Sequence, residues 1–187
     1  MIKKTSIILL TLLVLLTSCT SNKTIRPVYL TDEKAISLLD LESVGEPIDY
    51  YQLMTGSFNG KEKFTGEVLL QANEEELALV MMSTTGQTIA EISYDGFMTT
   101  FTSSFIPANA FKAEYIIADI QLAFYDEKEV KEEIEKSDLE FESGTDLKGE
   151  YREIYDGDEL IWRCVYQGNH VSVINYLRNY TYEMENL

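Results

Sequence analysis

The sequence predicts a mainly β fold of the α+β class: an antiparallel curved sheet, or incomplete β-barrel, with two helices inserted mid-chain as a lid. From Ile48 onward, short segments alternate apolar and polar residues, which is the period of a half-buried strand. Turn dipeptides separate these segments. Asn59-Gly60, Asp95-Gly96 and Asp156-Gly157 suit the positive φ angles of a type I′ hairpin. Between two groups of such segments, apolar residues recur at helical spacing instead.

Five strands are expected before the helical region and four after it, and a short segment at residues 138–142 can add a further one. Because consecutive strands are joined by tight turns, we expect an antiparallel meander. The expected strands are Tyr50–Phe58, Lys63–Ala72, Glu76–Met82, Thr88–Tyr94, Phe97–Phe105, Gly149–Tyr155, Glu159–Tyr166, His170–Leu177 and Asn179–Glu185.

The alternation also assigns the faces of this sheet. One side is apolar and aromatic, and the other is largely polar. A sheet with one apolar face must bury that face against another layer. The residues expected on the apolar side include Phe64, Val68 and Leu70, then Phe97, Phe101 and Phe105, and finally Leu160, Trp162 and Cys164.

The mid-chain helices are the expected cover. Pro107 ends the fifth strand, and Asn109 can cap a helix that runs to about Tyr125. Asp126, with a glutamate three residues later, resembles the capping pattern of a second helix that runs to about Lys136.

The N-terminus is typical of a secretory signal. Lys3 and Lys4 precede an apolar run of about ten residues, which is shorter than the ~20 needed to span a bilayer. Leu16-Thr17-Ser18-Cys19 resembles the bacterial lipobox, in which the cysteine is lipidated; an ordinary signal peptide cleaved nearby is the alternative. We therefore expect a signal peptide over residues 1–18, lipidated Cys19 and a tether over residues 19–46, and a single half-barrel domain over residues 47–187. One short helical turn is expected in the tether, near Lys34–Leu41.

The composition argues against several function classes. The 187 residues carry 32 acidic and 15 basic side chains, a formal charge of −17, which repels nucleic acid. A single histidine, His170, is poor material for a zinc site or a hydrolytic triad. Cys164 shares the phase of buried neighbours and is expected to be a structural thiol. Acidic runs at Glu74-Glu75-Glu76 and Asp156-Gly157-Asp158-Glu159 match no complete calcium loop. We expect no enzyme, no metal and no cofactor.

The apolar face itself has two interpretations. It can be a filled domain core, or it can line a cavity for an acyl chain if the helices cover a curved sheet without filling it. A wide half-barrel encloses more space than its own side chains fill, whereas a tight sandwich does not. Composition and periodicity do not separate these two interpretations.

Several segments resemble the DUF3261 family of bacterial lipoproteins, in the same order along residues 48–187. They are Tyr51-Gln52-Leu53, Glu67-Val68-Leu69-Leu70, Leu77-Ala78-Leu79-Val80, Gly86-Gln87, Ile92-Ser93-Tyr94-Asp95-Gly96, Ile117-Ala118-Asp119-Ile120-Gln121-Leu122 and the closing Asn175-Tyr176-Tyr180-Tyr182 region. That family is similar to the LolA/LolB lipoprotein carriers, which are open β-barrels closed by a helical lid over a hydrophobic cavity.

The resemblance implies a lipid-anchored protein of the cell envelope, facing the periplasm, that binds a fatty-acyl or aryl-polyene chain and assists its transport or outer-membrane delivery. Thr20 after the lipidated cysteine is compatible with the outer membrane. The implied cavity residues are Phe64, Val68, Leu70, Leu79, Phe97, Phe101, Leu160 and Trp162 from the sheet, with Ile116 and Ile120 from the lid. Thr85 stands where LolB-type receptors carry an exposed leucine, which speaks against lipoprotein insertion.

Two other functions remain open. One is a structural or assembly lipoprotein with a packed core, whose acidic exterior recruits a protein partner of a transport or biosynthesis pathway. The other is an acyl-transfer enzyme that uses Cys164 or a serine, which requires an exposed and reactive thiol in the cysteine case.

Overall fold

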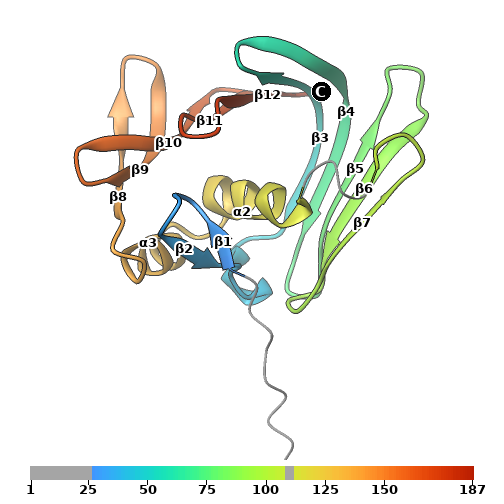
Figure 1. Cartoon of the computed structure of the whole chain (residues 1–187). Helices are drawn as coiled ribbons and strands as arrows, with labels where there is room; N and C mark the ends of the chain where they lie inside the picture. The colour runs from blue at the N-terminus through green and yellow to red at the C-terminus, as the bar shows by residue number, and fades with distance from the viewer. Residues whose placement is uncertain (1–26, 108–111) are drawn as a thin grey trace, which may run out of the picture.

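The computed structural model describes residues 27–107 and 112–187; the signal segment, Cys19 and the expected cap Asn109 lie outside these residues. A single ten-stranded sheet dominates the fold and curls around a central helix (Figure 1). All its pairings are antiparallel. Its strands are β3 (Ile48–Phe58), β4 (Lys61–Ala72), β5 (Leu77–Met82), β6 (Thr88–Tyr94), β7 (Thr99–Ser103), β8 (Glu140–Asp146), β9 (Gly149–Asp156), β10 (Glu159–Gln167), β11 (His170–Asn175) and β12 (Tyr180–Asn186).

The strand order explains the place of the helices. The order is β7-β6-β5-β4-β3-β12-β11-β10-β9-β8, so two meanders join at the centre, where β3 pairs with β12. Strands β7 and β8 are neighbours in sequence but form opposite edges of the sheet, which is therefore open. The chain between them has to cross from one edge to the other. Helix α2 (Ala113–Phe124) lies on the concave side of the sheet, and helix α3 (Glu127–Glu135) then leads to β8 (Figure 1).

The expected fold class is confirmed, and so are the strands, within a few residues at each end. The segment expected at residues 138–142 is the start of β8. At Asn59-Gly60 both residues have positive φ, as a type I′ turn requires. At Asp95-Gly96 only Gly96 does; the Asp95 carboxylate instead accepts hydrogen bonds from the backbone N–H groups of Phe97 and Met98. That wider turn delays the start of β7 to Thr99.

The second helix begins as predicted. The Asp126 carboxylate accepts hydrogen bonds from the backbone N–H groups of Lys128 and Glu129, which satisfies two of the free donors at the N-terminus of α3. Val130 and Ile134, one turn apart, are the fully buried residues of this helix, and charged side chains cover the rest. The two-residue break at Tyr125-Asp126 lets α3 leave the concave face, while α2 stays under the sheet (Figure 1).

The N-terminal part of the described chain corrects the expected tether. Residues 27–44 form strand β1 (Pro27–Tyr29), strand β2 (Ala35–Ser37) and the short 3-10 helix η1 (Leu41–Val44). Val28, Ile36 and Leu41 are buried in the same core as the sheet. The expected turn near Lys34–Leu41 is a strand followed by a later helical turn. The alternation of buried Val28 with its exposed neighbours is too short to predict a strand, because each of these strands has only three residues.

This N-terminal hairpin covers the outer side of the two helices: β1 contacts α2, and β2 contacts α3. The described core is thus assembled from residues 27–187, and a chain that starts at Thr20 retains every residue of that core. In the described part of the chain, neither α2 nor α3 has the length and hydropathy to cross a bilayer.

Candidate functional site: the concave face beneath helix α2

The apolar concave face of β3, β4 and β5 meets one side of α2. Val68, Leu70 and Leu79 from the sheet face Ile116 and Ile120 from the helix. These five side chains line part of a cavity of about 30 Å³, together with residues of β3, β11 and β12. Val68 and Leu70 are 1% exposed and Leu79 is 4% exposed. Five of the ten residues expected at the cavity are therefore brought together, by strands and a helix far apart in the sequence.

The cavity is small because α2 occupies the concavity. Its volume is about 30 Å³, close to the space of one water molecule and far below the ~300 Å³ at which ligand pockets usually begin. Ile117, Leu122 and Ala123 are also fully buried, so α2 is itself part of the core. A chain molecule can lie on this face only after α2 has moved away from it.

Three other expected residues lie near this face without lining the cavity. Trp162 is 1% exposed and contacts α2 through its indole N–H. Phe64 is partly buried against the core, and its ring lies over Gly56 of the neighbouring strand. Phe101 is partly buried on the edge strand β7.

The two remaining expected residues point elsewhere. Phe97 is 59% exposed, because it lies in the wide turn before β7 and the alternation of that strand does not extend to it. Leu160 is half-buried and pairs with Tyr155, whereas Trp162 pairs with Ile154. A β-bulge at Ile161 adds one residue to β10 between Leu160 and Trp162, so these two side chains lie on opposite faces of the sheet. Leu160 therefore faces the convex side with Tyr155.

A buried carboxylate fastens the middle of α2 to the sheet. Asp119 Oδ1 accepts a hydrogen bond from Trp162 Nε1 at 2.9 Å, and Asp119 Oδ2 accepts one from the Tyr180 hydroxyl at 2.6 Å. Burial raises the pKa of Asp119 to about 6, although its two hydrogen bonds and the charge of Arg178 act in the opposite direction. Asp119 therefore holds α2 in place at the cost of a desolvated charge.

Further bonds hold the C-terminal half of α2. Arg152 Nη1 donates to the carbonyl oxygens of Leu122 at 3.0 Å and Tyr125 at 2.9 Å. The Tyr166 hydroxyl donates to the carbonyl oxygen of Ala123. On the outer side, the Gln121 side-chain amide exchanges two hydrogen bonds with the backbone of Leu39, at 2.9 and 3.0 Å. We call these contacts, together with those of Asp119, the α2 latch.

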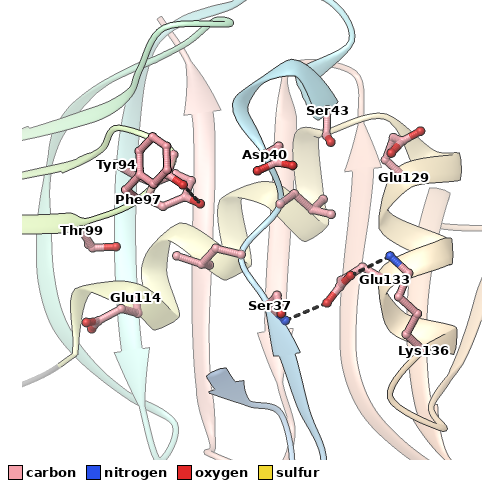
Figure 2. A pocket seen from close by; sticks show the side chains of 13 residues that line it. Ser37, Asp40, Ser43, Tyr94, Phe97, Thr99, Glu114, Glu129, Glu133 and Lys136 are labelled. Atoms are coloured by element: carbon pink, nitrogen blue, oxygen red, sulfur yellow. Dashed lines mark hydrogen bonds and ion pairs between the residues drawn. The ribbon is translucent and has the colours of Figure 1, made fainter. Parts of the chain in front are cut away.

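Two larger pockets flank α2. A pocket of about 510 Å³ lies at the C-terminal end of the helix, against β3 and β8 to β11. A second pocket, of about 290 Å³, lies between the N-terminal segment, α3 and the turn before β7 (Figure 2). Its lining is acidic, with Asp40, Glu114, Glu129 and Glu133 against Lys136. Glu133 is already bonded to the Ser37 N–H at 2.8 Å and to Lys136 at 3.1 Å.

The residues considered for an enzyme are not brought together. Cys164 is fully buried and pairs with Arg152 and Val173 in the sheet, and burial raises the pKa of its thiol to about 12. The imidazole of His170 lies 2.8 Å from a Glu183 carboxylate oxygen on the next strand. Among residues 27–107 and 112–187, no three or more His, Cys, Asp or Glu side chains form a group that could hold a metal ion.

Sequence reasoning missed the polar residues of this site. Asp119 is a charged residue on the apolar face of its helix, between Ile116 and Ile120, and that placement is a signal of a buried partner. Arg152 shares the strand phase of buried Ile154, which places it on the concave face. Gln52 shares the phase of Met54 and is 0% exposed.

Fold and site together define a class: an open antiparallel half-barrel whose apolar concave face is covered by one helix and fastened by a small set of polar bonds. The chain belongs to the DUF3261 family, described as a protein of unknown function, whose profile matches residues 49–187. A comparison with curated protein sequences finds no match.

Proposed function

We propose that this protein is a non-enzymatic lipoprotein of the cell envelope, similar to the LolA/LolB carriers. It is anchored through Cys19, faces the periplasm and binds a fatty-acyl or aryl-polyene chain between its sheet and α2. In this proposal the protein assists the transport of that chain to the outer membrane. It acts as a binding and transfer protein, and α2 is the lid that admits the chain.

The observation that carries the proposal is the open sheet whose apolar concave face over β3 to β5 is covered by one 12-residue helix. The α2 latch consists of seven hydrogen bonds. The four made by Asp119 and Arg152 involve a charged group and contribute roughly 1.5–3 kcal/mol each, and the other three contribute about 1 kcal/mol each. Burial of a methylene group contributes about 0.8 kcal/mol. A chain of about 16 carbons therefore contributes roughly 13 kcal/mol, which is comparable to the loss of the latch when α2 lifts and rests on the bound chain.

A binding titration tests the proposal. The chain from Thr20 onward is titrated with a fluorescent fatty acid, and we expect saturable binding. Leu70→Glu places a charge on the concave face and should abolish binding. Leu69→Glu changes the next residue of β4, which is on the convex face and half-buried, and should leave binding intact. Circular dichroism verifies that both variants retain their strands. An absence of saturable binding by the unchanged protein contradicts the proposal.

A second candidate rests on the closed interior and on the charge. Because the space beneath α2 is only about 30 Å³, the domain can also serve as a packed scaffold. The acidic pocket of Figure 2 and the net charge of −17 favour a basic protein partner in that case. This alternative predicts association that weakens with salt and no uptake of the fatty-acid probe.

A further inference from the structure

The 510 Å³ pocket and the apolar cavity meet at two residues. Gln52 of β3 and Phe124 at the end of α2 line both of them. The Phe124 ring also packs edge-on against Tyr50, with ring centroids 5.6 Å apart. A polar pocket that adjoins an apolar cavity suits an amphiphile, with room for a head group on one side and for a chain on the other once α2 has moved.

The cation in the larger pocket is Arg152, which has no anionic partner among the described residues. Its Nη1 donates to two backbone carbonyl oxygens, and its guanidinium lies 5.9 Å from the centre of the Tyr166 ring. Among the described residues, no carboxylate forms an ion pair with Arg152, and its Nη2 and Nε hydrogens have no protein acceptor. In a chain with 32 acidic residues, an arginine that is half-buried and unpaired has free donors for an anion.

The junction also carries an unmatched acceptor. Gln52 is 0% exposed, and its Nε2 donates to Asn186 Oδ1 at 2.8 Å, but its Oε1 has no hydrogen-bond partner in the described part of the chain. A buried carbonyl oxygen without a partner is costly, and a ligand hydroxyl at this position would satisfy it.

The acidic residues of the pocket limit the charge of the head. Glu127 and Glu150 also line it, and both are exposed, so they lie nearer to solvent than Arg152. Two carboxylates at this position disfavour a head with several negative charges, such as a phosphate, and tolerate a single carboxylate paired with the arginine.

We propose that the 510 Å³ pocket is the head-group site for a hydroxylated fatty acid: the carboxylate binds Arg152, a hydroxyl near the head donates to Gln52 Oε1, and the chain passes Phe124 to lie beneath α2. This inference rests on the proposed function, because the chain still requires α2 to move. Beyond the proposed function, it specifies that the ligand is a hydroxylated fatty acid and that its head lies at Arg152 with its chain beneath α2.

The test compares ligands within each variant, so that effects on the α2 latch cancel. The chain from Thr20 onward is titrated with 3-hydroxytetradecanoate, tetradecanoate and methyl tetradecanoate, with the single tryptophan, Trp162, as the reporter. A charge-assisted hydrogen bond and a neutral one correspond to roughly tenfold and fivefold in affinity. We therefore expect tetradecanoate to bind about tenfold more tightly than its ester, and the hydroxylated acid about fivefold more tightly than tetradecanoate.

Arg152→Gln should reduce the acid-to-ester ratio to about one, and Gln52→Leu should remove the preference for the hydroxylated acid. Arg178→Gln is the matched control. Arg178 also bonds to backbone carbonyl oxygens and lies 4.5 Å from a tyrosine ring of α2, at Tyr115, but it does not line the pocket. Its acid-to-ester ratio should equal that of the unchanged protein.

The outcomes separate the two proposals. If all three ligands fail to bind, the proposed function itself is wrong. If they bind with equal affinity, the chain site stands and the head-group site is overturned. If Arg178→Gln lowers the acid-to-ester ratio as much as Arg152→Gln does, the effect is one of general charge, and the assignment of the carboxylate to Arg152 is overturned.

Discussion

Replacement of Asp119 by asparagine removes a buried negative charge while it preserves the shape of the side chain. The asparagine side chain can still accept a hydrogen bond from Trp162 with its oxygen and can donate one to the Tyr180 hydroxyl with its amide. The variant therefore imitates the neutral form of the acid. It separates the cost of the charge from the geometry of the α2 latch.

The pKa of Asp119 gives the magnitude. Burial raises it from 3.8 to about 6, and each pKa unit corresponds to about 1.4 kcal/mol between the charged and neutral forms. The folded state binds the proton more tightly than the unfolded chain does. The resulting stability is fully present below pH 3.8 and is lost as the pH rises through about 6. At pH 7.5 the charge costs about 3 kcal/mol relative to the neutral acid.

Urea unfolding at pH 7.5 and pH 5.0, followed by Trp162 fluorescence, measures this difference. The free energy of unfolding of Asp119→Asn minus that of the unchanged protein should be more positive at pH 7.5 than at pH 5.0, by about 1 kcal/mol. Other titrating groups cancel in the comparison. Asp49→Asn, which removes an exposed carboxylate from β3, is the control. A difference between Asp119→Asn and the unchanged protein that does not vary with pH refutes the account of a desolvated latch.

Three further changes test the packing that positions the site. Asp126→Ala removes the cap of α3 and should lower the free energy of unfolding by about 1 kcal/mol in urea titrations; no change would mean that the cap is dispensable. Gly66→Ala brings a Cβ within 2.4 Å of the Met82 carbonyl oxygen and should cost about 2 kcal/mol by the same assay; an unchanged midpoint would contradict this close approach. Ile36→Ala should cost about 3 kcal/mol if the N-terminal hairpin belongs to the core, whereas a tether would tolerate it.

The strands were predictable because their signals are local. The pairs Asn59-Gly60 and Asp156-Gly157 mark hairpins that the structure forms, and alternation on β4 assigns Val68 and Leu70 to the concave face. The cap at Asp126 is equally local, since the side chain bonds to N–H groups two and three residues later. Such signals require no knowledge of the rest of the chain.

The site was less predictable because it depends on contacts between distant residues. Asp119 contacts Trp162 of β10 and Tyr180 of β12 only in the folded protein. The residues that flank Asp119 in the sequence do not indicate these partners. The bulge at Ile161 breaks an alternation that looks regular in the sequence, and it moves Leu160 to the other face. Short strands such as β1 are stabilised by burial of single residues rather than by a repeated pattern.

Mass spectrometry of the protein extracted from its own membrane tests the central claim most directly. If the concave face holds an acyl or polyene chain, one such chain per molecule should accompany the unchanged protein and Leu69→Glu, and it should be absent from Leu70→Glu. An extract in which the unchanged protein carries no chain, or in which both variants carry the same lipids, would contradict a carrier role for this half-barrel.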